Sequence, residues 1–221
     1  MTPLQARLDR ATATRPLLAH PFYEAWAAGT LTVDDLAFYS TQYWRQVEAF
    51  PGYLETVSRR VPAGPVRDTI LTNLADERDG DHPQLWLDFA QALGLDETTV
   101  RSSDAVAETR SCVESFRSAS AVASPAFALG MLYGYESQTP AVAETKVAGL
   151  RDHYGIDGGG AGYFELHGEL DVEHSNDMAA AIDQIATDDA ARADAESGAR
   201  SGAEAIWQLL DGVARVRGIG C

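Results

Sequence analysis

Residues 164–174 read Phe164-Glu-Leu-His167-Gly-Glu-Leu-Asp171-Val-Glu-His174, a segment with a helical pattern and metal-binding residue types. His167, Asp171 and His174 are spaced i, i+4 and i+7, so at 3.6 residues per turn they lie on one face of a helix. Two imidazoles and a carboxylate on one face form a facial ligand set suited to Fe, Mn or Zn. A solvated polar face is the alternative, but two of the chain's five histidines fall on this stripe.

The rest of the chain also reads as helices, because apolar residues recur with helical period and no segment shows sustained strand alternation. The helix with His167 is expected over residues 163–185, after a flexible glycine-rich loop at 155–162. Thr32 is expected to cap a long helix that Pro51 kinks. The run 187–203 is rich in Ala and Asp, and we expect a solvated helix there.

The other expected helices complete an all-α bundle. In chain order, the first begins near Pro3, and the next three cover about residues 21–28, 66–79 and 83–93. Another begins near residues 102–104, two more cover about 124–139 and 141–154, and the last passes through 206–213.

Length and composition restrict the class of protein. The 221 residues predict one domain over 1–221. A net charge of −16 argues against nucleic acid and anionic membranes as partners. No window reaches the ~18 apolar residues of a membrane span, and the first residues lack a signal-peptide core, so we expect a soluble, cytoplasmic protein. Cys112 and Cys221 are too few for a disulfide scaffold or a thiolate metal site.

A second candidate for metal chemistry is Glu136, in the segment Met131-Leu-Tyr-Gly-Tyr-Glu136. Its neighbours are largely apolar or aromatic, so the carboxylate is expected to point inward. Burying a carboxylate alone costs several kcal/mol, roughly, so it needs a cation or hydrogen bonds. A buried acid paired with an arginine is the alternative to a metal ligand.

A third candidate is the pair Glu77 and His82, which lie five residues apart. On a straight helix this spacing turns them about 140° away from each other. Gly80 and Pro83 indicate that the helix ends between them, so His82 could return toward Glu77 from the loop. In the competing interpretation, Asp81 or His82 caps the helix that starts at Pro83.

Three carboxylates and three imidazoles thus come from three helical regions. Helical bundles bind two metal ions between helices with such sets, and without cations the carboxylates would repel one another. The sequence therefore predicts a two-metal site from Glu77, His82, Glu136, His167, Asp171 and His174.

The motifs resemble those of the haem-oxygenase-like dimetal oxidases, and more closely the para-aminobenzoate synthases among them. The resemblance covers about residues 18–178. It rests most specifically on two motifs, Leu132-Tyr-Gly-Tyr-Glu136-Ser-Gln-Thr-Pro140 and Tyr163-Phe164 with His167, Asp171 and His174. The N-terminal motifs, 20–32 and 38–54, are shared more widely with thiaminase-like and pyrroloquinoline-quinone-synthase-like bundles. The resemblance implies a seven-helix bundle that activates O2 at two metal ions, Fe/Fe or Fe/Mn, with an external reductant.

The resemblance also implies roles for individual residues. The six residues above match the family's metal ligands, although the segment before His82 looks two residues shorter, which leaves Asp81 as a possible substitute. Tyr23 matches a tyrosine that is itself the substrate, Tyr39 one that relays oxidising equivalents, and Lys146 the amino donor. Lys146 is the only lysine among 17 basic residues.

Other interpretations stay open at this point. Tyr23 and Tyr39 sit among aromatic residues on amphipathic helices, where such residues usually pack in the core. The same metal site could oxidise an external amino acid or fatty acid, since a fold does not fix a substrate. A metal-free relative with a cysteine nucleophile would need Cys112, expected on an outward-facing helix, or Cys221. An interaction module and a homodimer are also compatible with the sequence.

Overall fold

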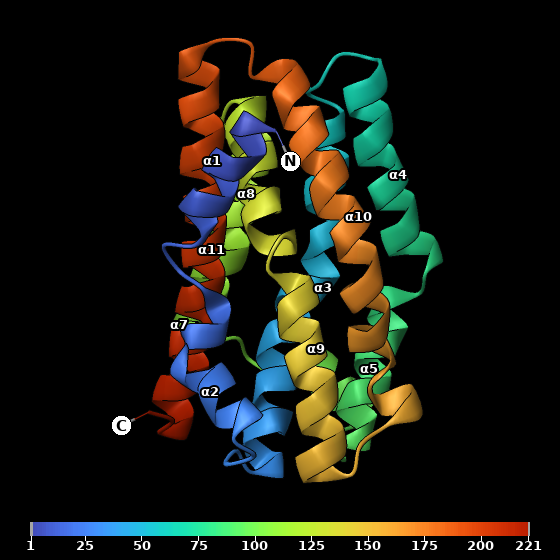
Figure 1. Cartoon of the computed structure of the whole chain (residues 1–221). Helices are drawn as coiled ribbons and strands as arrows, with labels where there is room; N and C mark the ends of the chain where they lie inside the picture. Colours follow the sequence, from blue (N-terminus) through green and yellow to red (C-terminus); the bar gives the residue numbers. More distant parts are fainter. Residues whose placement is uncertain (1, 221) are drawn as a thin grey trace.

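The computed structural model describes residues 2–220, and over these residues it is all-α with no strand. Figure 1 shows the long helices lying roughly along one common direction. The helices are α1 (Pro3–Thr12), α2 (Pro21–Ala27), α3 (Val33–Ser58), α4 (Pro65–Asp79), α5 (His82–Ala92), α6 (Glu97–Ser102), α7 (Ala107–Val122), α8 (Pro125–Glu136), α9 (Thr139–Gly149), α10 (Gly162–Ile185) and α11 (Asp189–Arg217).

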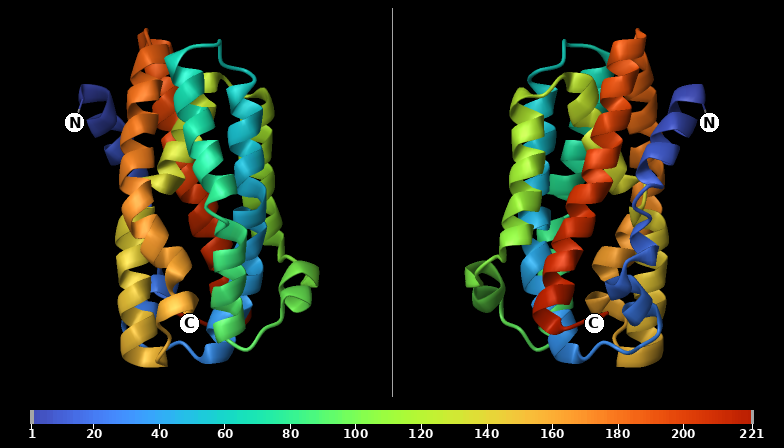
Figure 2. Two further views of the ribbon diagram at one scale, coloured as in Figure 1. Left: turned by 90° about the vertical axis from the view of Figure 1, so that its right-hand side faces the viewer. Right: turned by 90° about the vertical axis from the view of Figure 1, so that its left-hand side faces the viewer.

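The long helix α3 begins where its sequence predicts. The Thr32 hydroxyl accepts from the Asp35 backbone N–H, and the Asp35 carboxylate accepts from the Thr32 backbone N–H, which satisfies two free donors of the first turn. The helix continues through Pro51 to Ser58, so the proline does not end it. Figure 2 shows α3 beside α4, and α10 next to α4.

The C-terminal helix α11 packs closely against α8. The helix expected over 187–203 is confirmed, but the expectation that it is solvated is wrong for the face that packs against α8. A Cβ placed on Gly130 or Gly134 of α8 would lie 2.1 Å from the carbonyl oxygen of Ala195 or Ala199 on α11. Two glycines of α11 face α8 in the same way. Large apolar residues are absent here because the two backbones nearly touch, and this seam fixes the helix that carries Glu136.

The segment before α7 also differs from its prediction. A short helix, α6, precedes it, and α7 begins at Ala107 and not near Asp104. The side chain of Gln42 on α3 accepts from the Val106 N–H at 2.9 Å and donates to the Asp104 carbonyl at 3.1 Å. These hydrogen bonds to α3 hold the backbone before Ala107 extended, although the local sequence favours a helix that starts earlier.

The interior of the bundle is one apolar cluster that includes most of the aromatic residues. The largest buried side chains are Trp26, Trp44, Trp86, Tyr23, Tyr39 and Tyr133. Within residues 2–220, none of the helices combines the length and the apolar character that crossing a membrane requires.

Candidate metal centre

Glu77 and His82 meet across the tight turn between α4 and α5. Asp81 has φ of 52°, in the left-handed region, and this reverses the chain so that α5 starts at His82. A Cβ on Gly80 would lie 2.5 Å from His82 Nε2, so the turn requires glycine. His82 Nδ1 lies 3.0 Å from Glu77 Oε2, both side chains being buried. Asp81 is exposed at the N-cap position and makes no side-chain cap bond, so the structure brings His82 and not Asp81 to Glu77.

His167, Asp171 and His174 of α10 all face the interior, but they divide between two groups of potential ligands. His167 Nε2 lies 3.9 Å from Glu77 Oε1, whereas His174 Nδ1 lies 3.9 Å from Glu136 Oε1 and 3.5 Å from Asp171 Oδ1. The expected facial set on one stripe is therefore corrected. Seven residues of helix separate His167 from His174 by about 10 Å along the axis, which places them at neighbouring positions.

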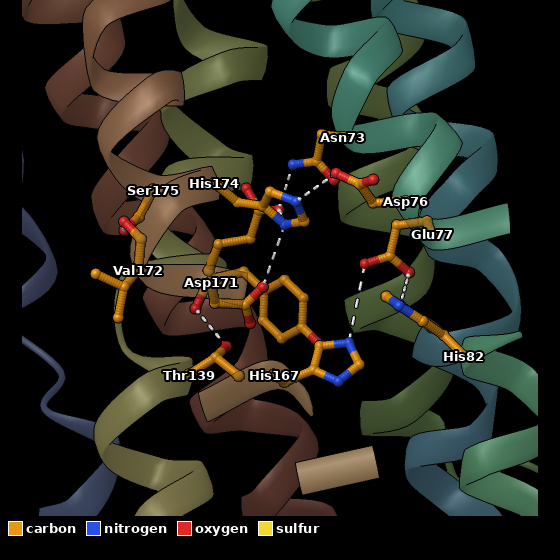
Figure 3. Close-up of polar contacts among 12 residues, drawn as sticks. Asn73, Asp76, Glu77, His82, Thr139, His167, Asp171, Val172, His174 and Ser175 are labelled. Atoms are coloured by element: carbon orange, nitrogen blue, oxygen red, sulfur yellow. Dashed lines mark hydrogen bonds and ion pairs between the residues drawn. The ribbon is translucent and has the colours of Figure 1, made fainter. Parts of the chain in front are cut away.

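Two three-residue groups result, and we call them together the polar centre (Figure 3). In each group the potential ligand atoms lie within 4.8 Å of one another, and all the side chains are buried. The groups are Glu77, His82 and His167, and Glu136, Asp171 and His174.

Contacts on the outer side of the polar centre orient its members. His167 Nδ1 lies 2.6 Å from the Tyr163 carbonyl and His174 Nε2 lies 3.1 Å from Asp76 Oδ2, so the other nitrogen of each ring faces inward. Asn73 donates to Glu136 Oε1 at 2.7 Å. Such outer partners set the tautomer and direction of metal ligands.

Asn73 and Asp76 were not among the residues that the sequence analysis selected. Asn73 precedes Glu77 by four residues, one helical turn, so the two share a face of α4. That spacing was the available signal for Asn73. Asp76 adjoins Glu77, and nothing in the sequence connects it to His174 on another helix.

Protonation of the second group follows from burial and crowding of charges. Burial and the Asp171 carboxylate raise the pKa of Glu136 to about 8, against the opposing effects of Asn73 and His174. For His174, burial alone would lower the pKa, but Asp171, Glu136 and Asp76 raise it to about 9. Without a metal ion, Glu136 and His174 therefore tend to keep their protons, and a cation bound between them would replace those protons.

The donor set fits metal ions. Four buried atoms of the polar centre make no hydrogen bond within residues 2–220, namely both ring nitrogens of His82, Nδ1 of His174 and Oε2 of Glu136. The 3.0 Å contact of His82 Nδ1 with Glu77 Oε2 is at ion-pair distance but does not have hydrogen-bond geometry. Buried polar atoms are rarely left unpaired, and these atoms belong to the polar centre. Mixed imidazole and carboxylate ligands suit iron or manganese. The polar centre can therefore hold two metal ions.

Lys146 lies deep in the bundle beside the two sequence-predicted tyrosines. Its side chain is 3% exposed, and Nζ donates to Tyr39 Oη at 2.6 Å. The rings of Tyr23, Tyr39 and Tyr43 lie 5.0 to 5.2 Å from Nζ. We call this surrounding of aromatic rings, completed by Phe164 and Trp26, the aromatic chamber.

Two effects oppose each other at this amine. Aromatic faces favour a cation, worth about 0.5–2 kcal/mol. Burial lowers the pKa of Lys146 well below its usual range, and within residues 2–220 no carboxylate forms an ion pair with it. Because desolvating a charge costs more than such ring contacts return, we take the amine to be neutral. Burial, with Tyr23 and Tyr43 nearby, raises the pKa of the Tyr39 phenol.

A small internal cavity connects the aromatic chamber with the polar centre. Its volume is about 10 Å³, and its lining includes Tyr23, Lys146 and His167. That is room for about one water molecule. A molecule of that size could reach both the amine and a residue of the polar centre.

Cys112 does not behave as a nucleophile, and its expected outward position is wrong. The side chain is fully buried, because this face of α7 packs against α3. Its Sγ lies 4.0 Å from Gln46 Oε1, and burial raises the pKa of the thiol. A thiol without a base or positive charge beside it is unreactive. Cys221 lies outside the described residues.

Comparison with known proteins agrees with this site. The 4-aminobenzoate synthase of Nitrosomonas europaea is 36% identical over 220 residues, which cover 94% of this chain and 89% of that protein. The 4-aminobenzoate synthase of Chlamydia pneumoniae is 34% identical over 172 residues, 77% of each chain. A domain of unknown function from Shewanella denitrificans, with a haem-oxygenase-like fold, superposes with a TM-score of 0.83 at 16% identity, covering 96% of this chain and 92% of that one.

These likenesses confirm the predicted fold and enzyme class. The haem-oxygenase-like bundle is shared with the solved structure, and the family described as iron-containing redox enzymes matches residues 37–207. That range contains the whole polar centre. The chain therefore belongs to the family of iron-containing redox enzymes with a haem-oxygenase-like fold.

Proposed function

We propose that this chain is a 4-aminobenzoate synthase that uses its own side chains as substrates. Tyr23 provides the aromatic ring, Lys146 provides the nitrogen, and the six residues of the polar centre hold two metal ions, Fe/Fe or Fe/Mn. With an external reductant, the metal pair supplies O2 activation. The observation that carries the proposal is the buried amine of Lys146, enclosed with Tyr23 and Tyr39 beside the polar centre.

The state of Lys146 suits an amino donor. A neutral amine has a free electron pair, and burial favours this neutral form because it lowers the pKa of Lys146. The direct contact with Tyr39 Oη fixes the position of the amine. A structural lysine buried in a core would normally be paired with a carboxylate, and among residues 2–220 this one is not.

The surroundings of the two tyrosines support roles that follow one another. Tyr23 and Tyr39 are both fully buried, and the chamber excludes bulk water from any oxidised intermediate on their rings. Tyr39 lies 4.7 Å, ring centre to ring centre, from Phe22, the neighbour of Tyr23 in α2. We assign Tyr39 the relay role and Tyr23 the role of the consumed residue.

Intact mass is the decisive measurement. Protein purified without O2 is loaded with Fe(II), with or without Mn(II), then exposed to reductant and O2, and its mass is compared before and after. We expect a defined mass loss that maps to Tyr23, with a change at Lys146, and free 4-aminobenzoate. Tyr23→Phe should form none. Tyr133→Phe is the matched control, because that hydroxyl is buried against Asp9 and lies outside the aromatic chamber.

An unchanged mass with O2 consumed would overturn the proposal. It would favour the alternative in which the same metal pair oxidises an external amino acid or fatty acid.

A further inference from the structure

Trp86 occupies the middle of the aromatic residues that separate the polar centre from Tyr39. The indole is fully buried on α5. Its ring centre lies 4.8 Å from Tyr163, 5.1 Å from Tyr43 in a stacked arrangement, and 5.9 Å from Tyr39. These spacings are those of rings in direct contact.

The ring contacts begin at a residue of the polar centre. The imidazole of His167 stacks on Tyr163, with 4.0 Å between ring centres and 26° between planes. Rings in contact therefore run without a break from His167 through Tyr163 and Trp86 to Tyr39. Tyr39 in turn touches Lys146.

The hydrogen-bond partners of Trp86 and Tyr39 determine the direction of electron transfer along this series of rings. Trp86 Nε1 donates to the Ser40 carbonyl at 3.0 Å. A carbonyl is too weak a base to take the indole proton, so an oxidised Trp86 keeps it and remains a strong one-electron oxidant. Tyr39 Oη lies 2.6 Å from the Lys146 amine, and a neutral amine can accept the phenol proton. Oxidation is therefore easier at Tyr39 than at Trp86.

We propose that Trp86 is the electron relay between the polar centre and Tyr39, an inference that rests on the proposed function. Metal ions held by the polar centre would supply the one-electron oxidant in the presence of O2, and the Tyr163 and His167 rings would carry one electron from Trp86 toward it. Tyr39 then gives one electron to Trp86, which returns to its resting state. The Tyr39 O–H bond breaks, and its proton forms an N–H bond on Lys146, so the electron lost by Tyr39 ends on that oxidant. Tyr39 is left as a neutral phenoxyl radical.

A second buried tryptophan allows the relay to be separated from simple packing. Trp44 on α3 is as buried as Trp86. Its ring lies 4.7 Å from the guanidinium of Arg101. Among residues 2–220, the close ring pairs of Tyr163, Trp86 and Tyr39 do not include Trp44, so it lies outside both the aromatic chamber and this series of rings.

The test compares Trp86→Phe, Trp86→Tyr and Trp44→Phe. Each metal-loaded variant is reduced, mixed with O2 and freeze-quenched. Metal content and O2 uptake are measured together with the electron paramagnetic resonance signal of a tyrosyl radical, and Tyr39→Phe identifies the signal. We expect Trp86→Phe to bind metal and consume O2 normally while the radical yield falls at least about tenfold. Trp86→Tyr should recover part of the signal, and Trp44→Phe should retain it.

A second measurement needs no metal. Ultraviolet flash photolysis of the metal-free protein oxidises tryptophans, and transient absorption follows the decay of indolyl and the rise of phenoxyl radicals. We expect Trp86→Phe to lose the main transfer phase and Trp44→Phe to keep it. Lys146→Met should slow the phase because the proton acceptor is gone.

Three results would overturn the relay: a wild-type radical yield in Trp86→Phe, an equal loss in Trp44→Phe, or no transfer phase that depends on Trp86 in the metal-free protein. Failure of the proposed function is a separate result, since it appears as an unchanged intact mass in the wild type.

Discussion

The polar centre and the aromatic chamber lie side by side in one bundle, yet they handle buried ionisable groups in opposite ways. The polar centre gathers three carboxylates and three imidazoles. Burial and the Asp171 carboxylate raise the pKa of Glu136 to about 8, and the neighbouring carboxylates raise that of His174 to about 9 against the effect of burial. The chamber encloses a single amine without a carboxylate partner, and burial lowers its pKa. One region binds extra protons in the absence of a cation, and the other gives its proton up.

The two regions share helices, so the difference is one of local surroundings. Phe164 and His167 are three residues apart on α10, and they face the chamber and the polar centre respectively. A single turn of helix thus separates a site that needs positive charge from one that rejects it. Burial favours the neutral form at both Glu136 and Lys146, whereas at His174 the carboxylates within reach outweigh burial and raise the pKa.

Replacing Lys146 should have the largest effect on product and the clearest contrast between the regions. Lys146→Met should abolish 4-aminobenzoate formation, keep both metal ions and raise the free energy of unfolding, because Met fills similar space without a group that must lose its proton on folding. Lys146→Arg should lower the unfolding midpoint, since a guanidinium stays charged. Product assays, metal analysis and thermal unfolding measure these effects. An arginine variant as stable as wild type would show that the rings hold a cation after all.

Removing a carboxylate from the polar centre should affect metal binding and leave the chamber intact. We expect Glu136→Ala to lower the bound metal from two equivalents to one, with at least about a 100-fold loss of affinity at the second position. Glu144→Ala is the control, because that carboxylate is exposed on α9. Metal titration followed by elemental analysis gives the stoichiometry. Two tightly bound ions in Glu136→Ala would contradict the assignment of this residue as a ligand.

The raised pKa values of the polar centre predict proton release when metal binds. At pH 7 the metal-free protein holds protons on Glu136, with a pKa of about 8, and on His174, with a pKa of about 9. A metal ion needs both groups deprotonated, so loading should release about two protons, and affinity should rise with pH until about pH 9. Calorimetry in two buffers of different ionisation enthalpy counts the protons. Glu136→Gln should release one fewer, and binding without proton release would rule out this protonation state.

The smallest effect concerns the seam that holds α8 in place. Gly134→Ala puts a Cβ 2.1 Å from the Ala199 carbonyl oxygen, and we expect it to lower the free energy of unfolding by about 1–3 kcal/mol. Gly52→Ala is the matched control on α3, where a Cβ meets nothing within 4 Å, and there alanine should stabilise by roughly 0.5–1 kcal/mol. Chemical denaturation measures both. Equal stability of the two variants would mean that α8 and α11 can separate at little cost.

Much of the site was predictable because helical spacing is local. The period of 3.6 placed His167, Asp171 and His174 on one inward face, and Gly80 with Pro83 indicated the turn that returns His82 to Glu77. What periodicity does not contain is which helix lies opposite. The division of the α10 residues between two groups and the contact of Asp76 with His174 depend on how α4 and α8 pack.

The two incorrect expectations, for the 187–203 run and for Cys112, also arise because the sequence does not show which helix packs opposite. The 187–203 run looked solvated because it lacks large apolar residues, but small residues permit a closer approach of α8 than large ones would. Cys112 looked outward because its partner Gln46 lies on a distant segment of the chain. A single sequence shows the apolar face of a helix more readily than the partner that covers it.

The position of Lys146 gives the proposed reaction an unusual stoichiometry. Because it is the only lysine in 221 residues, a chain that has given up this nitrogen has no side-chain amine left, and no second lysine can take its place. Each protein molecule then acts as a reagent and not as a recycled catalyst. The amount of product would follow the number of chains that the cell translates, and mass mapping of the peptide that contains position 146 would count the chains not yet spent.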